Sequence, residues 1–173
     1  MPEESIDIAT LADLLQSHAG EGARVIAAIA GAPGSGKSTL AEKLVGKLNG
    51  RQPGLGAILP MDGYHYDDLY LVPAGLRPRK GAPMTFDVGG FFHTLKRLRA
   101  RDEDEVAVPV FDRKIEIARA GARLNPKEVP VIVVEGNWLL LKQSPWDRLH
   151  PMFDVTVMVD VPEHVLRARL RGR

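Results

Sequence analysis

The sequence lacks cysteine altogether, which excludes disulfide bonds, metal sites built on thiolates and cysteine nucleophiles. It also lacks an excess of charge: its formal net charge is only +1, so the composition gives no reason to expect nucleic acid or an anionic membrane as a partner. No apolar run approaches the roughly 20 residues that a membrane-spanning helix needs. The acidic start, Met1–Ser5, has no basic segment followed by an apolar core, so we expect no signal peptide and a cytoplasmic location.

The remaining composition is that of an ordinary folded domain. Hydrophobic residues make up 45% and charged residues 26% of the chain. A length of 173 residues is enough for one domain with a proper core and too short for two. The sequence shows no internal repeat and no low-complexity segment. We therefore expect residues 1–173 to form a single domain whose core spans 22–173.

One glycine-rich stretch has the pattern G-x-x-x-x-G-K-[ST] and continues into a threonine: Gly31, Ala32, Pro33, Gly34, Ser35, Gly36, Lys37, Ser38 and Thr39. It follows an apolar run at 25–30 and opens a segment with helical periodicity, which is the context in which this pattern binds phosphates. The glycines let backbone N–H groups converge on an anion, and the helix start adds the positive end of its dipole. Lys37 can reach the terminal phosphates, and the Ser38 hydroxyl can bind Mg²⁺. We predict a nucleotide-binding loop rather than a structural glycine turn.

Hydrophobic periodicity predicts strands that alternate with helices. Four apolar runs are typical of strands: 25–30, 57–59, 129–134 and 155–159, of which 129–134 is the clearest buried one. Helical spacing is found in four segments: 5–18, 40–48, 88–101 with Asp87 as N-cap, and a final helix from 162. This alternation predicts an α/β fold of three layers, a parallel sheet with helices on both faces.

Three further segments are less regular. Residues 64–87 show no convincing periodicity and read as a long substrate-side loop. Residues 106–127 suggest a hairpin that turns at Ala120-Gly121, with Pro109 favouring an edge position. The sequence Ser144-Pro145-Trp146 predicts a short helix with proline at its first helical position.

Two acidic residues follow apolar runs directly. Asp62 comes after the second run and Glu135 ends the third. Because ligands bind beyond the carboxyl ends of the strands in such sheets, both acids should stand beside the phosphate loop. Phosphoryl transfer needs charge neutralisation and a carboxylate for the accepting hydroxyl. Asp62 is our candidate base and Glu135 our candidate Mg²⁺ carboxylate, acting through water. Either acid could instead cap a helix, and the two roles could be exchanged.

Several other polar residues are candidates for contacts with ligands. The arginines at positions 167 and 171 lie one helical turn apart, as do 169 and 173, and could close over the phosphates as a lid. The alternative is a solvent-facing basic helix end. Residues expected to contact the acceptor are Tyr64 and His65, which adjoin Asp62, and the basic residues Arg79 and Lys80 beside Arg77. A packing role for the first two and a solvated loop for the others are the alternatives.

Together these blocks resemble the P-loop small-molecule kinases of the uridine kinase and type I pantothenate kinase group. Within that group the chain is most similar to bacterial proteins labelled fructose-transport-system kinases. The resemblance runs from about Val25 to the end and rests on these blocks in order: Gly31–Thr39, Met61–Tyr64, Arg79–Pro83 with Phe86-Asp87, Pro109–Asp112 and Val134–Gly136. Many nucleotide-binding proteins share the first block. Asp62-Gly63 with Lys80-Gly81-x-Pro83 is more specific to the pantothenate kinase side.

The resemblance implies ATP as donor, Mg²⁺, a hydroxyl acceptor, Asp62 as base and lid arginines beginning near Arg167. It also implies that another core strand follows the lid, so 162–173 would be only the start of the lid. Uridine kinases carry His and Arg where this chain has Glu116 and Ala118, and pantothenate kinases carry His where Arg113 stands. Arg113 therefore becomes a candidate contact for another acceptor, such as the sugar fructose. A pantothenate or nucleoside kinase is the alternative.

A nucleotide-binding regulatory or assembly protein with little turnover is the rival from another functional class. The long loop after Asp62 favours an acceptor pocket, because a nucleotide switch has less need of a second acid beside the phosphates. No Asn-Lys-x-Asp guanine motif is present, which disfavours a GTPase. The expected partner is a small hydroxyl-bearing molecule, and the sequence leaves a homodimer open.

Overall fold

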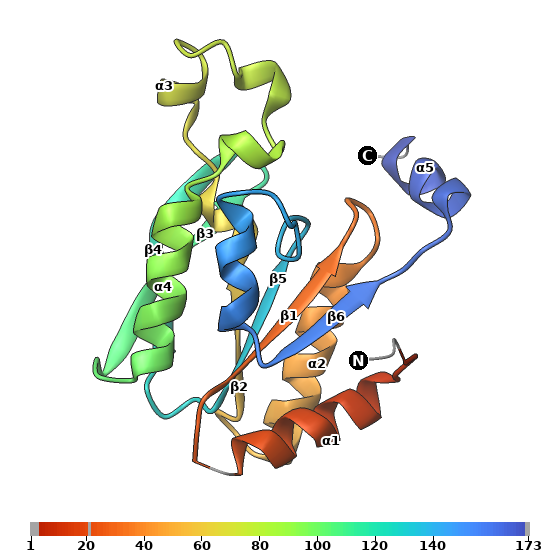
Figure 1. The fold of residues 1–173 in the computed structure, drawn as a ribbon, viewed down its shortest axis with the longest axis vertical. Coiled ribbons are helices and arrows are strands. Elements are labelled where there is room, and N and C mark those ends of the chain that lie inside the picture. The colour runs from red at the N-terminus through yellow and green to blue at the C-terminus, as the bar shows by residue number, and fades with distance from the viewer. Residues whose placement is uncertain (1–3, 21, 172–173) are drawn as a thin grey trace.

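A four-stranded parallel sheet organises the computed structural model, which describes residues 4–20 and 22–171 (Figure 1). Its strands lie in the order β2 (Gly56–Pro60), β5 (Val131–Gly136), β1 (Val25–Gly31) and β6 (Val155–Val159). Each neighbouring pair is parallel. Every residue of β1 and β5 is buried, as expected for central strands of a sheet that is covered on both faces.

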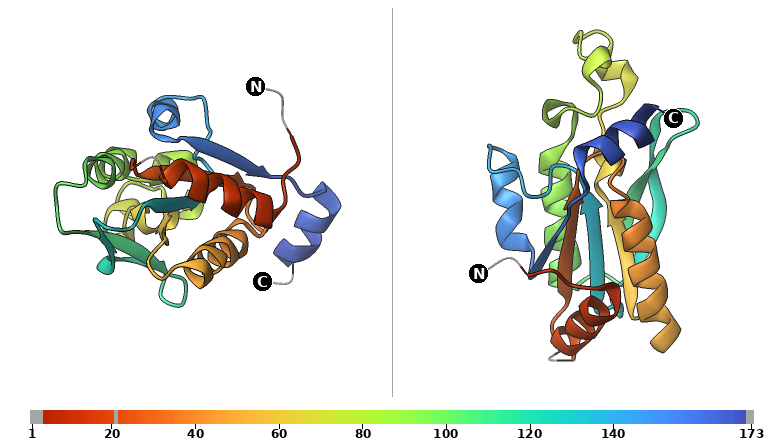
Figure 2. Two further views of the ribbon diagram at one scale, coloured as in Figure 1. Left: turned by 90° about the horizontal axis from the view of Figure 1, so that it is seen from below. Right: turned by 90° about the vertical axis from the view of Figure 1, so that its right-hand side faces the viewer.

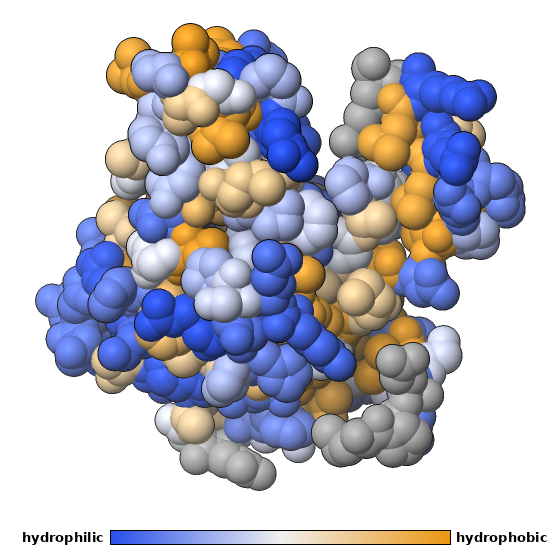
Figure 3. Space-filling view, turned by 45° about the horizontal axis from the view of Figure 1, so that its top comes forward, coloured by the Kyte–Doolittle hydropathy of each residue, from blue (hydrophilic) through white to orange (hydrophobic). Residues whose placement is uncertain are grey.

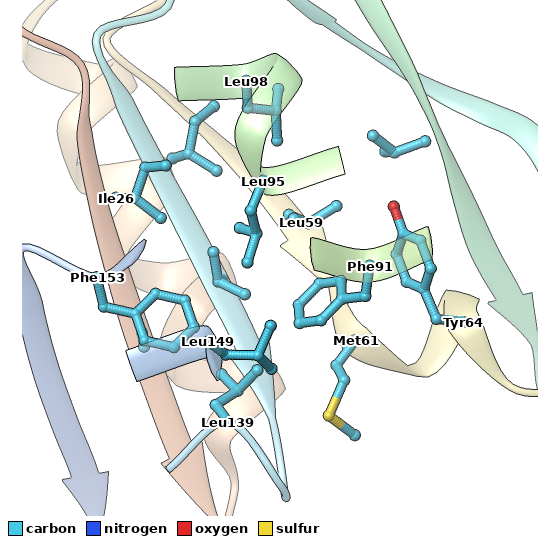
Figure 4. Close-up of a cluster of buried hydrophobic side chains, with 14 of the residues drawn as sticks. Ile26, Leu59, Met61, Tyr64, Phe91, Leu95, Leu98, Leu139, Leu149 and Phe153 are labelled. Carbon is cyan, nitrogen blue, oxygen red and sulfur yellow. The ribbon is translucent and has the colours of Figure 1, made fainter. Parts of the chain in front are cut away.

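Helices cover both faces of this sheet, so the predicted three-layer α/β fold is confirmed (Figure 2). On one face lie α1 (Ile8–Ala19) and α2 (Lys37–Arg51), packed on Ala27 and Ile29 of β1. On the other lie α4 (Val88–Ala100) and the 3₁₀ helix η4 (Trp146–Met152), packed on Ile26 (Figure 4). Alternate residues of β1 therefore serve opposite cores, because side chains alternate along a strand.

The predicted hairpin is present, but the predicted turn is wrong. Strands β3 (Glu105–Asp112) and β4 (Ile117–Pro126) pair antiparallel and turn at residues 113–116. Ala120-Gly121 lies inside β4, opposite a register shift between Val108 and Val110 that brackets Pro109. Proline has no N–H for the ladder, so a bulge forms there, and Gly121 takes the left-handed conformation with φ +62°. The Ala120-Gly121 pair therefore marks a β-bulge and not the turn of the hairpin.

The long segment between β2 and α4 folds into short helical turns: η1 (Met61–Tyr64), α3 (Asp68–Leu71), η2 (Arg77–Arg79) and η3 (Pro83–Thr85). It ends at the predicted N-cap of α4, where Oδ1 of Asp87 accepts a 2.8 Å hydrogen bond from the Gly90 amide. Pro145 is the N-cap residue of η4, so the prediction that it occupies the first helical position is wrong.

The last element is α5 (Glu163–Arg171), which follows β6 and lies at the same end of the molecule as the carboxyl ends of the strands (Figure 1). None of the helices formed by residues 4–20 and 22–171 is long and apolar enough to cross a bilayer.

Candidate functional site

The glycine-rich loop joins β1 to α2 with a backbone that only glycine adopts freely. Gly34 and Gly36 have φ values of +82° and +93°, in the left-handed region that disfavours other residues. A Cβ on Gly31 would lie 2.6 Å from Oγ of Ser35 and 3.2 Å from Val159. The loop therefore turns tightly into the first turn of α2, whose N–H groups have no partner within the helix and favour an anion.

Two polar groups of this loop fit a phosphate ligand. Lys37 is only 7% exposed and lines the cavity in front of the loop. Within the described part of the chain, no carboxylate lies in salt-bridge distance of its ammonium group. The buried hydroxyl of Ser35 has no hydrogen-bond partner among the described residues. A buried cation and a free donor are groups that a phosphate would satisfy.

Glu135 ends β5 beside this loop. It is 5% exposed, and its Oε2 accepts a 3.1 Å hydrogen bond from the Ser38 hydroxyl. Burial raises the pKa of the Glu135 carboxyl, the negative charge of Asp62 raises it further, and the positive charge of Lys37 opposes both. The hydroxyl and carboxylate oxygens are hard ligands of the kind Mg²⁺ prefers, so these residues fit that ion.

Asp62 stands at the same edge of the sheet, because Pro60 of β2 pairs in register with Glu135. Its side chain is 16% exposed, and Oδ2 accepts a 2.8 Å hydrogen bond from the Arg113 guanidinium. The following glycine serves packing: a Cβ on Gly63 would lie 2.4 Å from the carbonyl oxygen of Pro109. Gly63 therefore allows the close approach of η1 to β3.

The adjacent residues Tyr64 and His65 face different surroundings. Tyr64 is 7% exposed and packs against Phe91, with 4.8 Å between ring centroids (Figure 4). Burial raises the pKa of its hydroxyl to about 12. The structure therefore places Tyr64 in the core, outside the lining of the cavity, with its hydroxyl buried and without a hydrogen-bond partner among the described residues.

His65 lines the cavity and lies between Phe86 and Phe111, at centroid distances of 4.0 and 4.7 Å. Its Nδ1 lies 2.7 Å from the carbonyl oxygen of Asp62. A carbonyl can only accept, so Nδ1 carries the proton, and Nε2 of the neutral ring is left as an acceptor. Burial lowers the pKa of this histidine and keeps the ring neutral near pH 7.

The basic residues of the loop at 64–87 are held by two acids. Lys80, whose side chain is 8% exposed, lies 2.7 Å from Oδ1 of Asp68 and donates a 2.7 Å hydrogen bond to the Glu116 carbonyl. Arg77 bonds the same aspartate at 2.7 Å and also pairs with the Glu116 carboxylate. Both cations line the cavity, whereas Arg79 is exposed and lies outside its lining. These pairs fasten the loop to the tip of the β3–β4 hairpin.

The cavity of about 300 Å³ lies between the phosphate loop on one side and, on the other, the loop at 64–87 together with the hairpin tip that it contacts. Figure 3 looks toward this end of the molecule and shows the surface hollowed between the lobe that carries α3 and helix α5. A second cavity of about 160 Å³ shares Ser38, Asp62, Phe111 and Arg113 with the first. Glu135 lines this second cavity. Asp62 is therefore accessible from two sides.

Sequence reasoning missed Asn137 and Phe111 among the cavity residues. Asn137 follows Glu135-Gly136 at the carboxyl end of β5, so its position after a buried strand was a usable signal. Phe111 stood in one of the blocks that carry the family resemblance, but nothing in the sequence told which way its ring would point.

Helix α5 contacts the phosphate loop through Arg169. Its Nη1 donates to the carbonyl oxygens of Gly34 and Ser35, at 3.0 and 3.4 Å. Arg167 instead pairs with Glu163 one turn earlier at 2.6 Å, with its side chain 68% exposed, and Arg171 is exposed. Arg173 lies outside the described residues. The lid roles of Arg167 and Arg171 stay predictions.

Comparisons with known proteins bear on this site. No protein-family model matches the chain. A crystal structure of a protein from Silicibacter sp. TM1040, provisionally named a fructose transport system kinase, is 39% identical with a TM-score of 0.87, covering 98% of this chain and 82% of that one. The uncharacterised protein YggC of Escherichia coli K12 is 35% identical over 158 residues, 87% of this chain and 62% of YggC. A provisionally named uridine kinase of Schizosaccharomyces pombe is 34% identical over 156 residues, 87% of this chain and 66% of its own length.

Further matched proteins carry the names uridine kinase and pantothenate kinase, at 32% and 28% identity. The chain spans just under two thirds of the length of the first two curated relatives, at 62% and 66%.

Proposed function

This chain belongs to the P-loop small-molecule kinases of the uridine kinase and pantothenate kinase group, and from that premise we propose that it transfers the γ-phosphoryl group of ATP to a hydroxyl of a small metabolite. The observation that carries the proposal is that Lys37, Asp62 and a cavity of about 300 Å³ meet at one edge of the sheet. A protein that only binds nucleotide has less need of a second acid and of an open cavity beyond its phosphate loop. ATP use also agrees with the cytoplasmic location expected from composition.

The residues divide the chemical work. The loop amides and Lys37 hold the phosphates, and the oxygens of Ser38 and Glu135 would hold Mg²⁺, which neutralises phosphate charge when bound. Asp62 orients the acceptor hydroxyl and takes its proton. The hydroxyl oxygen forms a bond to the γ-phosphorus while the bond from that phosphorus to the bridging oxygen breaks, and ADP leaves.

For the acceptor we propose a neutral polyhydroxy compound, such as the sugar fructose. Arg77 and Lys80, two cations on the acceptor side, are both paired with the Asp68 carboxylate, so a carboxylate acceptor such as pantothenate would have to displace that partner. The neutral His65 ring offers an acceptor nitrogen to a second hydroxyl. The provisional name of the relative from Silicibacter points to a sugar too.

The test is ADP release measured with ATP, Mg²⁺ and a panel of D-fructose, uridine and pantothenate, with each phosphorylated product identified by mass spectrometry. We expect one hydroxyl compound to raise ADP release, and we expect Lys37→Ala to abolish that response. If the protein binds ATP normally but no compound raises ADP release, the kinase proposal falls and the regulatory or assembly alternative takes its place.

A further inference from the structure

We propose that Arg113 discriminates against water as a phosphate acceptor. Its guanidinium pairs with the Asp62 carboxylate until an acceptor molecule displaces the guanidinium. This inference rests on the kinase function proposed above. It assigns Arg113 a positioning role that acts through Asp62, and it predicts that ATP is protected from hydrolysis while the acceptor site is empty.

The geometry of the pair places it in the path of the acceptor. Nη2 of Arg113 lies 2.8 Å from Oδ2 of Asp62. Both residues line both cavities, so the guanidinium covers one carboxylate oxygen at the point where a hydroxyl must approach. A carboxylate oxygen that accepts a hydrogen bond from a guanidinium has less capacity left to accept one from an approaching hydroxyl. Asp62 is therefore restrained in the structure without an acceptor.

Arg113 can leave this position without disturbing its surroundings. Its side chain is 64% exposed, compared with 16% for Asp62, and Asp62 is its only recorded polar partner among the described residues. Exposed side chains change rotamer within picoseconds to nanoseconds, so release is a local event. The pair is partly screened by solvent and is weak enough for a ligand to displace.

The hairpin tip that carries Arg113 is fixed by other contacts. Glu116 pairs with Arg77, and its carbonyl accepts the 2.7 Å hydrogen bond from Lys80. Asp112 accepts hydrogen bonds from the Lys114 amide at 3.0 Å and from Arg119 at 2.8 Å. The backbone of the tip is thus held from both sides, while the Arg113 side chain remains free to swing.

The two competing reactions differ only in the nucleophile. With an acceptor, its oxygen bonds the γ-phosphorus, the bond to the bridging oxygen breaks, the proton goes to Asp62 and ADP leaves. With water, the same bonds form and break, and the products are inorganic phosphate and ADP. A polyhydroxy acceptor makes several contacts in the cavity and can compensate for the lost ion pair. A single water molecule makes too few contacts to do so.

The experiment measures phosphate release from ATP and Mg²⁺ without any acceptor, using the full chain. We expect Arg113→Gln to raise this hydrolysis by about tenfold, a fraction of the roughly 10²–10⁴ that a free general base supplies. Arg113→Lys should stay near the wild-type rate, because it retains the charge. Lys114→Gln is the matched control: it removes a charge from the adjacent exposed position, and the Lys114 side chain has no hydrogen-bond or ion-pair partner among residues 4–20 and 22–171.

The double variant Arg113→Gln with Asp62→Asn distinguishes a positioning role from a structural one. If Arg113 acts through the base, the added hydrolysis disappears in the double variant. The inference is overturned if Arg113→Gln binds ATP normally and hydrolyses it no faster than wild type, or if the rise survives the loss of Asp62. Failure of the wild-type protein to bind ATP is a different result, since it overturns the proposed kinase function and the inference together.

Discussion

The hydroxyl of Ser38 donates a 3.1 Å hydrogen bond to Oε2 of Glu135, joining two residues that lie 97 positions apart in the chain. The contact exists because β1 and β5 pair in parallel, with Ile29 opposite Glu135. Their carboxyl ends therefore place the last residue of the phosphate motif beside a buried acid. Two oxygen ligands suited to a divalent cation are thus in place next to the loop.

Asp62→Asn should separate nucleotide binding from transfer. Asparagine keeps the shape of the side chain but cannot take the hydroxyl proton, so transfer should fall by about 10²–10⁴-fold while ATP affinity changes by no more than about twofold. Single-turnover transfer and equilibrium binding of a fluorescent ATP analogue measure the two quantities. Asp102→Asn, exposed in the turn at the far end of α4, is the control. Transfer at the wild-type rate in Asp62→Asn would remove this residue from the base role.

Glu135→Gln should raise the Mg²⁺ concentration required for half-maximal activity by about 10- to 100-fold, the range seen when groups that orient metal ligands are lost. The comparison is a Mg²⁺ titration of wild type, Glu135→Gln and Glu128→Gln, an exposed glutamate before β5. An unchanged requirement in Glu135→Gln would show that this acid does not assist the metal.

The raised pKa of Glu135 has a definite sign for stability. The folded protein favours the protonated acid, so the stabilisation is present below the ordinary pKa of 4.5 and is lost as pH rises through the folded value. Without Mg²⁺, Glu135→Gln should therefore unfold at the same or a higher temperature than wild type at pH 8. Thermal unfolding with and without Mg²⁺ checks this, and a lower midpoint for metal-free Glu135→Gln would contradict it.

His65 predicts an acid limit on acceptor binding. Its folded pKa is lowered by burial, so the ring stays neutral around pH 7, and Nε2 becomes a donor only below the ordinary value of 6.5. As the pH falls below 6.5 we expect the KM for the acceptor to rise, with kcat affected less. We expect this rise in KM to be smaller in His65→Gln. The unfolded chain binds the proton more readily than the folded protein, so the free energy of unfolding also decreases as the pH is lowered below the ordinary pKa of 6.5. Long-range ¹H–¹⁵N spectra test the tautomer directly, and a protonated Nε2 at pH 7 would refute it.

Arg24 predicts a stability effect far from the site. It is 3% exposed, and its guanidinium donates to four carbonyl oxygens, those of Leu98, Pro126, Lys127 and Val129, at 2.6–2.9 Å. Burial lowers its pKa to about 10. Arg24→Met should lower the free energy of unfolding by roughly 2–4 kcal/mol, because several hydrogen bonds from a charged donor are lost. Urea unfolding measures this loss.

Nucleotide affinity is the control measurement for Arg24→Met. Arg24 precedes β1 at the amino end of the sheet, opposite the phosphate loop, so nucleotide affinity at low temperature should be unchanged. Arg24→Lys should be nearly as destabilised, since one ammonium group cannot reach all four carbonyls. A stability loss below about 0.5 kcal/mol in Arg24→Met, the ordinary surface value, would contradict the structural role.

Local sequence patterns were sufficient to predict the structure wherever the conformation of a short segment depends mainly on its own residues. Gly34 and Gly36 had to be glycine for their backbone angles, Asp87 had to cap α4, and the apolar runs formed strands, which are fully buried in β1 and β5 but have no buried residue in β6. The carboxyl ends of parallel strands lie at one edge of a sheet, which is why the sequence could place Asp62 and Glu135 together there. These features depend on neighbours within a few residues or on a regularity common to all parallel sheets.

The tertiary structure decided which side chain of each local set faces the site. Residues two positions apart on a helix point in directions that differ by roughly 200°. Only the docking of α5 therefore shows that Arg169, and not Arg167, contacts the phosphate loop. Packing likewise turned Tyr64 into the core and left His65 in the cavity. The pairing of Arg113 with Asp62 spans 51 residues and depends on the hairpin turning at residues 113–116, which the sequence did not reveal. The sequence by itself predicted a phosphate-binding loop at the end of β1; the packing of distant segments decided which side chain pairs with Asp62 beside that loop.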